Sequence, residues 1–188
     1  MNIEEILICL KNTYKSPDKK VREESEKKLS ELKNQNIVSF STQLIDLLKL
    51  PSQELDNNLR MSIILQLKRS IKEKIENDLL DLDSCNQLIQ LFITIIVNPM
   101  MIRKEIENLK ETFISLLNNT TVDILIEIIK YINEQISSMP LGSVNGVITI
   151  LLSIIQISSL DKKKFLIIIL LTFLNYYPIF VKVILINQ

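Results

Sequence analysis

The sequence predicts an all-α protein in which helical hairpins stack into a right-handed superhelix. The 188 residues include only 2 glycines and 5 prolines, too few for the many tight turns of a sheet protein. Hydrophobic residues make up 47% of the chain, and they recur at the three- and four-residue spacing of amphipathic helices. The isoleucine-rich run 167–171 has strand propensity, but the length of its apolar segment and the lack of flanking glycines favour a helix there as well.

The first hairpin is predicted from residues 3–14 and 17–33. Ser16 is expected to cap the second helix, with Pro17 at its first position and Asp18 at the positive end of its dipole. Helical spacing gives each helix one inner stripe. The stripe of the first helix is Ile3, Ile6, Leu10 and Tyr14, and that of the second is Val21, Ser25, Leu29 and Leu32.

The next helices are predicted over residues 37–49 and 54–76, with Pro51 breaking the chain between them. The helix that contains Arg60 repeats a pattern seen at Arg22: an apolar residue and an arginine, then a small residue, then a leucine. Two such units roughly 40 residues apart are typical of stacked helical repeats of the HEAT type. Proteins of this kind act by presenting a surface to partners.

Five more helices are expected, at 84–97, 99–117, 121–137, 143–158 and 162–186. Asn98 and Pro99 are predicted to cap and open the helix over 99–117. The whole pattern amounts to about four hairpins and the start of a fifth. We divide it into residues 1–118, about three repeats, and residues 119–188, further repeats of a stack that stops short at its carboxyl end.

The composition argues against an enzyme and against nucleic-acid binding. The chain has no histidine, no glycine-rich phosphate loop and a formal net charge of +0. No nucleophile and base are paired, so we expect no catalytic residue, no metal site and no cofactor. Cys9 and Cys85 are predicted to be buried thiols, and Asp78, Asp81 and Asp83 are predicted to cap helices.

A membrane protein is the main structural alternative. Residues 165–186 are about long enough to span a bilayer, and Gly142 and Gly146 have the spacing of a membrane-helix interface. Asn175, Pro178 and Lys182 interrupt that segment. We therefore favour a buried helix whose covering repeat lies beyond Gln188, and no membrane insertion. On this interpretation the chain is an amino-terminal fragment.

The first 116 residues resemble the amino-terminal repeats of the importin-beta (karyopherin-beta) superfamily, nearest the importin-7/importin-8 and exportin-2 branch. The residues that carry the resemblance are Ile6, Cys9, Leu10, Thr13, Tyr14, Ser16, Pro17 and Asp18, then Val21, Arg22, Ser25, Glu26 and Leu29. In the second repeat the family shows an arginine, small residues and Leu-Lys-Asn before an apolar residue. Here the positions are Arg60, Ser62, Leu67, Lys68, Arg69 and Ile71, with Arg69 in place of the asparagine.

The resemblance implies a nuclear transport receptor, working in protein transport between cytoplasm and nucleus and at the nuclear envelope. It implies that the second helices of the hairpins line a concave face that binds the GTPase Ran in its GTP form. Cargo proteins and nucleoporins would bind the remainder of a longer chain, and nucleic acid would not bind directly. The basic residues expected to contact Ran are Lys20, Lys27, Arg60, Lys68, Arg69, Lys72, Arg103 and Lys104.

Two other readings stay open at this point. The alternatives are a HEAT-like adaptor scaffold that has no GTPase partner and a membrane-anchored helical protein, and we place both after the transport receptor. Arg60 also has a purely structural interpretation, an ion pair with Asp56 four residues earlier on the same helix.

Overall fold

The computed structural model describes residues 3–50, 55–135 and 138–157, and within them the protein is all-α. The prediction of the fold class at this level is confirmed. The described part contains eight α-helices and one short 3₁₀ turn. These elements are α1 (Ile3–Lys15), α2 (Lys19–Gln35), α3 (Ile37–Leu48), α4 (Asn57–Glu76), α5 (Leu82–Ile96), α6 (Arg103–Asn118), α7 (Val122–Gln135), η1 (Leu141–Ser143) and α8 (Val144–Ile155).

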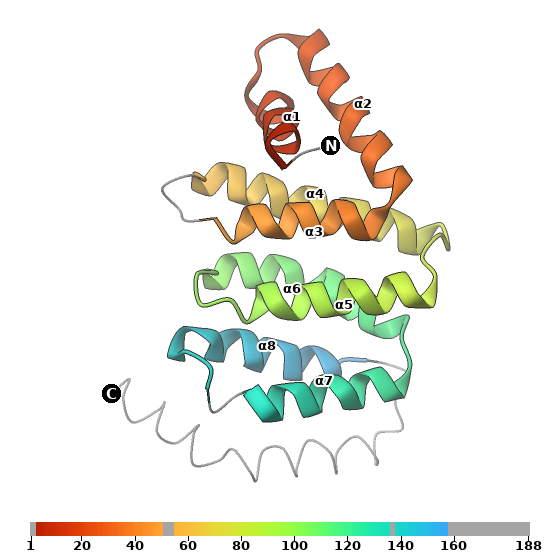
Figure 1. The fold of residues 1–188 in the computed structure, drawn as a ribbon, viewed down its shortest axis with the longest axis vertical. Coiled ribbons are helices and arrows are strands. Elements are labelled where there is room, and N and C mark those ends of the chain that lie inside the picture. Colours follow the sequence, from red (N-terminus) through yellow and green to blue (C-terminus); the bar gives the residue numbers. More distant parts are fainter. Residues whose placement is uncertain (1–2, 51–54, 136–137, 158–188) are drawn as a thin grey trace.

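The helices follow one another as four antiparallel hairpins piled in chain order (Figure 1). From α3 onward the pile has two layers, with α3, α5 and α7 on one side and α4, α6 and α8 on the other. Within the second layer α4 packs on α6 and α6 packs on α8, and in the first layer α3 packs on α5. Each hairpin therefore covers mainly the hairpins next to it.

The first hairpin is oriented differently from the other three (Figure 1). Helix α1 packs on both α3 and α4, and α2 packs on α3. Figure 1 shows α2 beginning at the far end of the molecule and descending toward α3. The predicted inner residues of this hairpin are confirmed in part: Ser25 and Leu29 are buried, whereas Tyr14 is 39% exposed.

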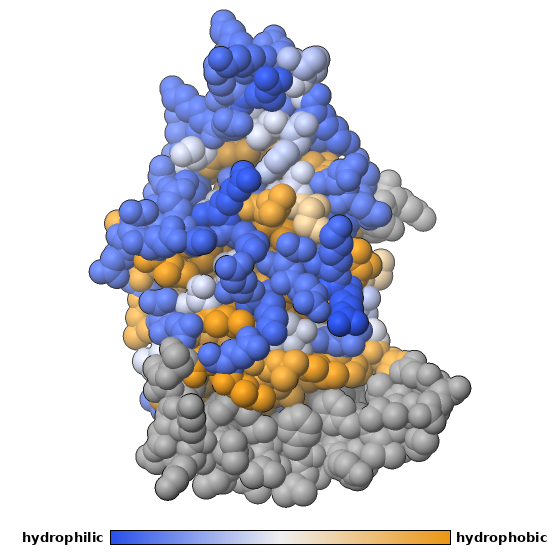
Figure 2. Space-filling model, turned by 180° about the vertical axis from the view of Figure 1, so that it is seen from behind, coloured by the Kyte–Doolittle hydropathy of each residue, from blue (hydrophilic) through white to orange (hydrophobic). Residues whose placement is uncertain are grey.

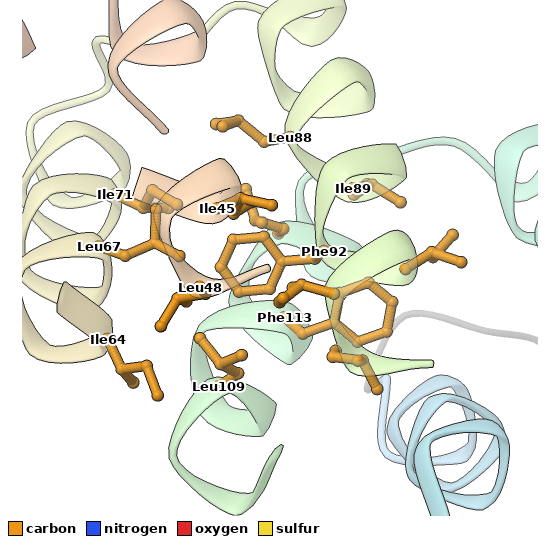
Figure 3. Close-up of a cluster of buried hydrophobic side chains, with 14 of the residues drawn as sticks. Ile45, Leu48, Ile64, Leu67, Ile71, Leu88, Ile89, Phe92, Leu109 and Phe113 are labelled. Atoms are coloured by element: carbon orange, nitrogen blue, oxygen red, sulfur yellow. The ribbon is translucent and has the colours of Figure 1, made fainter. Parts of the chain in front are cut away.

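The core is a continuous apolar layer between the two rows of helices. Its centre contains Phe92 of α5 and Phe113 of α6, whose rings stack with centroids 6.2 Å apart (Figure 3). Isoleucines and leucines of α3 and α4 surround them, and all are fully buried. Each buried leucine or isoleucine side chain contributes roughly 1.5–3 kcal/mol to folding, which makes this layer the main source of stability.

Two predicted helix starts are wrong. Asp18, not Ser16, caps α2, because its Oδ1 accepts a hydrogen bond from Lys20 N at 2.8 Å, and Pro17 lies before the cap. Helix α6 begins at Arg103, and Pro99 lies in the turn before it. There the Asn98 side chain accepts a hydrogen bond from Met100 N at 2.9 Å, so it shapes the turn and does not cap the helix.

Other boundaries shift by a few residues. Helix α4 starts at Asn57, and Asp56 caps it through Leu59 N at 2.8 Å. Helix α5 starts at Leu82, and the predicted capping role of Asp81 is confirmed by its bond from Ser84 N at 2.8 Å. The predicted helix 143–158 is the 3₁₀ turn η1 followed by α8. The predicted helix 162–186 lies outside the described residues.

Gly146 marks the closest approach between two helices. A Cβ atom built on it would lie 2.0 Å from the carbonyl oxygen of Ile96 and 2.9 Å from the Cα of Val97. Only a residue without a side chain lets α8 contact the carboxyl end of α5 in this way. Of the two glycines that suggested a membrane-helix interface, Gly146 thus serves packing within the helical stack.

Asp56 tethers the first hairpin to the second. Its Oδ2 accepts a hydrogen bond from Lys15 Nζ at 2.6 Å while its Oδ1 caps α4. The bond from Lys15, followed by the bond from Leu59 N, lowers the pKa of Asp56 below its ordinary value of 3.8. Because the folded state holds this proton less tightly than the unfolded state, the tether stabilises the fold above about pH 4 and is lost as pH falls further.

We expect Asp56→Asn to flatten the fall in the free energy of unfolding between pH 5 and pH 2, because asparagine keeps the cap but has no proton to gain. Lys15→Met should flatten it in part, since it removes the charged partner. Urea titrations across this range, followed by circular dichroism, measure the effect. Slopes identical to that of the unmodified protein in both variants would show that Asp56 does not contribute to acid sensitivity.

Candidate interaction surface

The second-helix face is our name for the outward sides of α4, α6 and α8, which Figure 2 views directly. Five of the eight residues predicted to bind Ran lie on it. They are Lys68, Arg69 and Lys72 of α4, and Arg103 and Lys104 of α6. Four of these are exposed, and the side chain of Lys68 is 25% exposed.

Arg60 does not belong to this face, and its predicted exposure is wrong. It is 4% exposed and lies inside the stack. Its Nε donates to Glu105 Oε1 at 2.7 Å, and its Nη1 donates to the carbonyl oxygen of Leu48 at 3.0 Å. Glu105, which is 3% exposed, also accepts a hydrogen bond from Ile102 N at 3.0 Å. The expected pair with Asp56 does not form.

This buried pair joins three elements. Arg60 belongs to α4, Glu105 to the first turn of α6, and Leu48 to the last turn of α3. The carboxylate of Glu105 also satisfies one of the free N–H groups at the start of α6, where negative charge is favourable. Arg60 is therefore a connector between the second and third hairpins, and it is unavailable to a partner.

The spacing of the apolar residues that follow Arg60 indicates that its side chain is buried. Ile63, Ile64 and Leu67 follow it at three, four and seven residues, which places Arg60 on the apolar stripe of its helix. Glu105 likewise shares a stripe with Leu109 and Leu116. A charge on such a stripe indicates a buried ion pair, although spacing alone does not identify its partner.

Lys68 and Lys72 share one side of α4, as predicted. Lys68 Nζ lies 3.0 Å from Glu111 Oε2 of α6, and Lys72 Nζ lies 3.7 Å from Glu76 Oε1. The hydrogen bond from Lys68, and then the charges of Lys68 and Lys72, lower the pKa of Glu111. Lys68 is thus paired with an acid of the neighbouring hairpin, whereas Lys72 forms a longer ion pair within its own helix.

The remaining cations of the second-helix face lie at two places. Arg69 is exposed on α4 beside Lys72, and its charge lies near the hydroxyl of Tyr14. Arg103 and Lys104 are exposed in the first turn of α6, where Arg103 Nε lies 3.4 Å from Glu107 Oε1. Lys68 of α4 contacts Glu111 of α6, and Glu111 lies eight residues after Arg103. The cations of α4 and those at the start of α6 are therefore about two turns of helix apart.

Lys20 and Lys27 are not brought together with the other predicted residues. Both are exposed on α2, and Lys20 lies in its first turn, at the end of the molecule farthest from α6 (Figure 1). A residue that sequence analysis missed connects α2 to α4. Lys33, with 10% of its side chain exposed, places its Nζ 2.7 Å from Glu73 Oε2. Lys33 follows the buried Ser25 by eight residues, a helical spacing that places both on the same side of α2 and indicates that Lys33 is buried.

Several hollows lie on the surface of the described residues. One, of about 500 Å³, lies between α1 and α2 and includes Ile8, Cys9 and Leu32 in its wall. Another, of about 240 Å³, lies between α6 and α8 on the second-helix face. Neither hollow holds a paired nucleophile and base. Within the described residues, no three histidine, cysteine or acidic side chains gather closely enough to hold a metal ion.

Both cysteines are free and buried, as predicted. Burial raises the pKa of Cys85 to about 11, and its Sγ donates to the carbonyl oxygen of Leu116 at 3.4 Å. Burial also raises the pKa of Cys9. A thiol that is buried and protonated is a poor nucleophile, so both cysteines fit a packing role.

No helix among the described residues combines the length and apolar character needed to cross a bilayer. The segment 165–186, on which the membrane alternative rests, lies outside the described residues. Comparisons with family models, with curated proteins and with solved structures find no match to this chain.

Proposed function

We propose that the protein is a scaffold that binds other proteins through its second-helix face. The observation behind this proposal is the arrangement of α4, α6 and α8, which lie parallel in one layer and expose a broad surface of charged and apolar side chains. The described hollows on it contain no paired nucleophile and base, which favours docking over catalysis. We further propose that the pile of hairpins is a right-handed superhelix of HEAT repeats.

The resemblance to the importin-beta superfamily supports a more specific proposal, the amino-terminal arm of a nuclear transport receptor. The partner is then Ran in its GTP form, and the sites of action are the cytoplasm, the nucleus and the nuclear envelope. Ran binding would be coupled to capture or release of cargo by flexing of the stack. Such coupling is reciprocal, because cargo must change the affinity for Ran by the same factor.

Burial and ion pairing leave fewer residues that we assign to Ran binding. Arg60 is buried, and Lys68 is paired with Glu111. Arg69 and Lys72 on α4 remain as one cationic place, and Arg103 and Lys104 on α6 remain as the other. Exposed cations of this kind accelerate association with an acidic partner and make the rate depend on salt.

We expect the double variant Arg69→Glu/Lys72→Glu to bind Ran-GTP about tenfold more weakly than the unmodified protein, mainly through slower association. Its affinity should also depend less on salt. Surface plasmon resonance with Ran loaded with GTP or GDP, at several salt concentrations, measures both effects. The matched control is Lys49→Glu/Lys130→Glu, which makes the same change of charge on the opposite layer.

Equal binding of Ran-GTP by the two double variants would remove Arg69 and Lys72 from the interface. If Ran binds in neither nucleotide state, the transport-receptor proposal is wrong, and an adaptor scaffold without a GTPase partner is the alternative that we favour.

A further inference from the structure

Helix α8 differs from the other second helices because it carries no charge. The sequence has no acidic or basic residue between Glu134 and Asp161, and α8 lies within that stretch. Three large apolar side chains, Ile148, Leu152 and Ile155, follow each other at four and three residues along its outward side. Leu152 is 46% exposed and Ile155 is 45% exposed. Figure 2 shows hydrophobic residues along the lower edge of the described surface, at the level of α8.

The apolar side of α8 forms one wall of a groove. The hollow of about 240 Å³ lies between α8 and α6. Its α8 wall contains Ile148 and Leu152 together with the polar residues Asn145 and Thr149, and its α6 wall contains Arg103, Ile106 and Glu107. It adjoins a second hollow, of about 510 Å³, whose lining includes Arg103 and Lys104. The two hollows share Arg103 and Glu107, so they adjoin each other at the start of α6.

The charge along this groove is one-sided. Arg103, Glu107 and Lys110 fall on one stripe of α6 by helical spacing, and the first two line the groove beside α8. Lys104 lines the adjoining hollow, so two cations lie beside one carboxylate along the groove. Arg103 Nε is 3.4 Å from Glu107 Oε1, and Lys104 therefore supplies the excess positive charge. The other nearby carboxylate on α6, Glu111, is paired with Lys68. Because α8 contributes no acid, no described residue of the opposite wall neutralises the excess positive charge.

We infer that this groove binds an acidic amphipathic helix of a partner protein. An apolar stripe with spacing i, i+4 and i+7 matches the apolar stripe of a helix laid along it. Glutamate or aspartate beside that stripe would meet Arg103 and Lys104, whereas a basic helix would meet like charge and be rejected. The site includes Arg103 and Lys104, which we also assign to Ran, but it does not include Arg69 and Lys72, and its test needs no GTPase.

The probe is a synthetic helical peptide of about four turns, with leucines on one side and glutamates along its flank, labelled for fluorescence anisotropy. A matched peptide has lysine in place of every glutamate. We expect the full chain to bind the acidic peptide and to bind the basic one at least about tenfold more weakly.

Two sets of variants separate the apolar contribution from the charged one. Leu152→Ser/Ile155→Ser should weaken binding of the acidic peptide by about tenfold or more, and Arg103→Ser/Lys104→Ser should abolish the preference over the basic peptide. The control is Leu79→Ser/Leu82→Ser, which removes two equally exposed apolar side chains near the start of α5. Circular dichroism must show that every variant keeps its helix content.

Three outcomes would overturn the inference. One is equal binding of the acidic and basic peptides. Another is unchanged binding by the Leu152→Ser/Ile155→Ser variant. The third is a dimer in sedimentation that the same variant dissociates, because the groove would then be occupied by a second copy of this chain.

Discussion

Replacing Arg60 by alanine is expected to lower the free energy of unfolding by about 3–5 kcal/mol. The change leaves the Glu105 carboxylate buried without its cation and removes the donor to the Leu48 carbonyl. A charge stranded in the core costs more than a lost contact, since neither water nor another cation reaches it. Because the pair joins α3, α4 and α6, its loss weakens the contact between the second and third hairpins.

Urea unfolding of Arg60→Ala, Glu105→Ala and the double variant Arg60→Met/Glu105→Leu measures this. The two single variants should each lose several kcal/mol, and the double variant should recover a large part because it buries apolar groups of similar size. Arg69→Ala is the matched control, since it removes an exposed arginine from the same helix and should change stability by less than about 0.5 kcal/mol. A loss from Arg60→Ala no larger than that of the control would mean that the pair contributes little.

Replacing Gly146 by alanine is expected to destabilise the fold by about 3 kcal/mol. Alanine favours a helix over glycine by about 1 kcal/mol, so an open position would gain stability. Here the new methyl group would meet the Ile96 carbonyl oxygen at 2.0 Å and the Val97 Cα at 2.9 Å. These are backbone atoms of α5, which cannot rotate aside, so α8 must move away from α5 and leave a gap in the core.

Thermal unfolding followed by circular dichroism tests this, with Gly142→Ala as the control. At Gly142 the nearest atom to a new Cβ is the Pro99 side chain at 3.1 Å, a contact that small shifts of the turn relieve. We expect a shift of a few degrees for Gly142→Ala and a much larger fall for Gly146→Ala. An unchanged or higher melting temperature for Gly146→Ala would contradict the tight approach of the two helices.

The helices of the described part were predictable because their apolar residues repeat at helical spacing, a signal that each segment carries by itself. The helix starts were less predictable, because several capping residues often compete. At the start of α2 both Ser16 and Asp18 are good caps, and the carboxylate is the one that reaches Lys20 N. At the start of α6, Pro99 has the features of a first helical residue, but it lies in a turn, and its Cβ is 3.1 Å from a Cβ built on Gly142.

The candidate surface was predicted less well than the fold. Charge alone predicts an exposed side chain, and this prediction fails for Arg60, which lies on an apolar stripe. Lys33, which was not among the predicted residues, is buried as well. Their partners, Glu105 and Glu73, are 45 and 40 residues away in sequence. Which acid meets which base depends on how consecutive hairpins are placed against each other, and local spacing holds no information about that.

The long-range ion pairs of the described part have a mechanical consequence. Lys15–Asp56, Lys33–Glu73, Arg60–Glu105 and Lys68–Glu111 span 41, 40, 45 and 43 residues, so each connects one hairpin with the next and none reaches farther. Two of these pairs join the first hairpin to the second, and the other two join the second to the third. Under tension along the stack, rupture of both pairs at one junction separates the two hairpins there and leaves the other junction intact. Such a chain lengthens in separate steps, each releasing about one hairpin, and closes again from whichever neighbours are still in place.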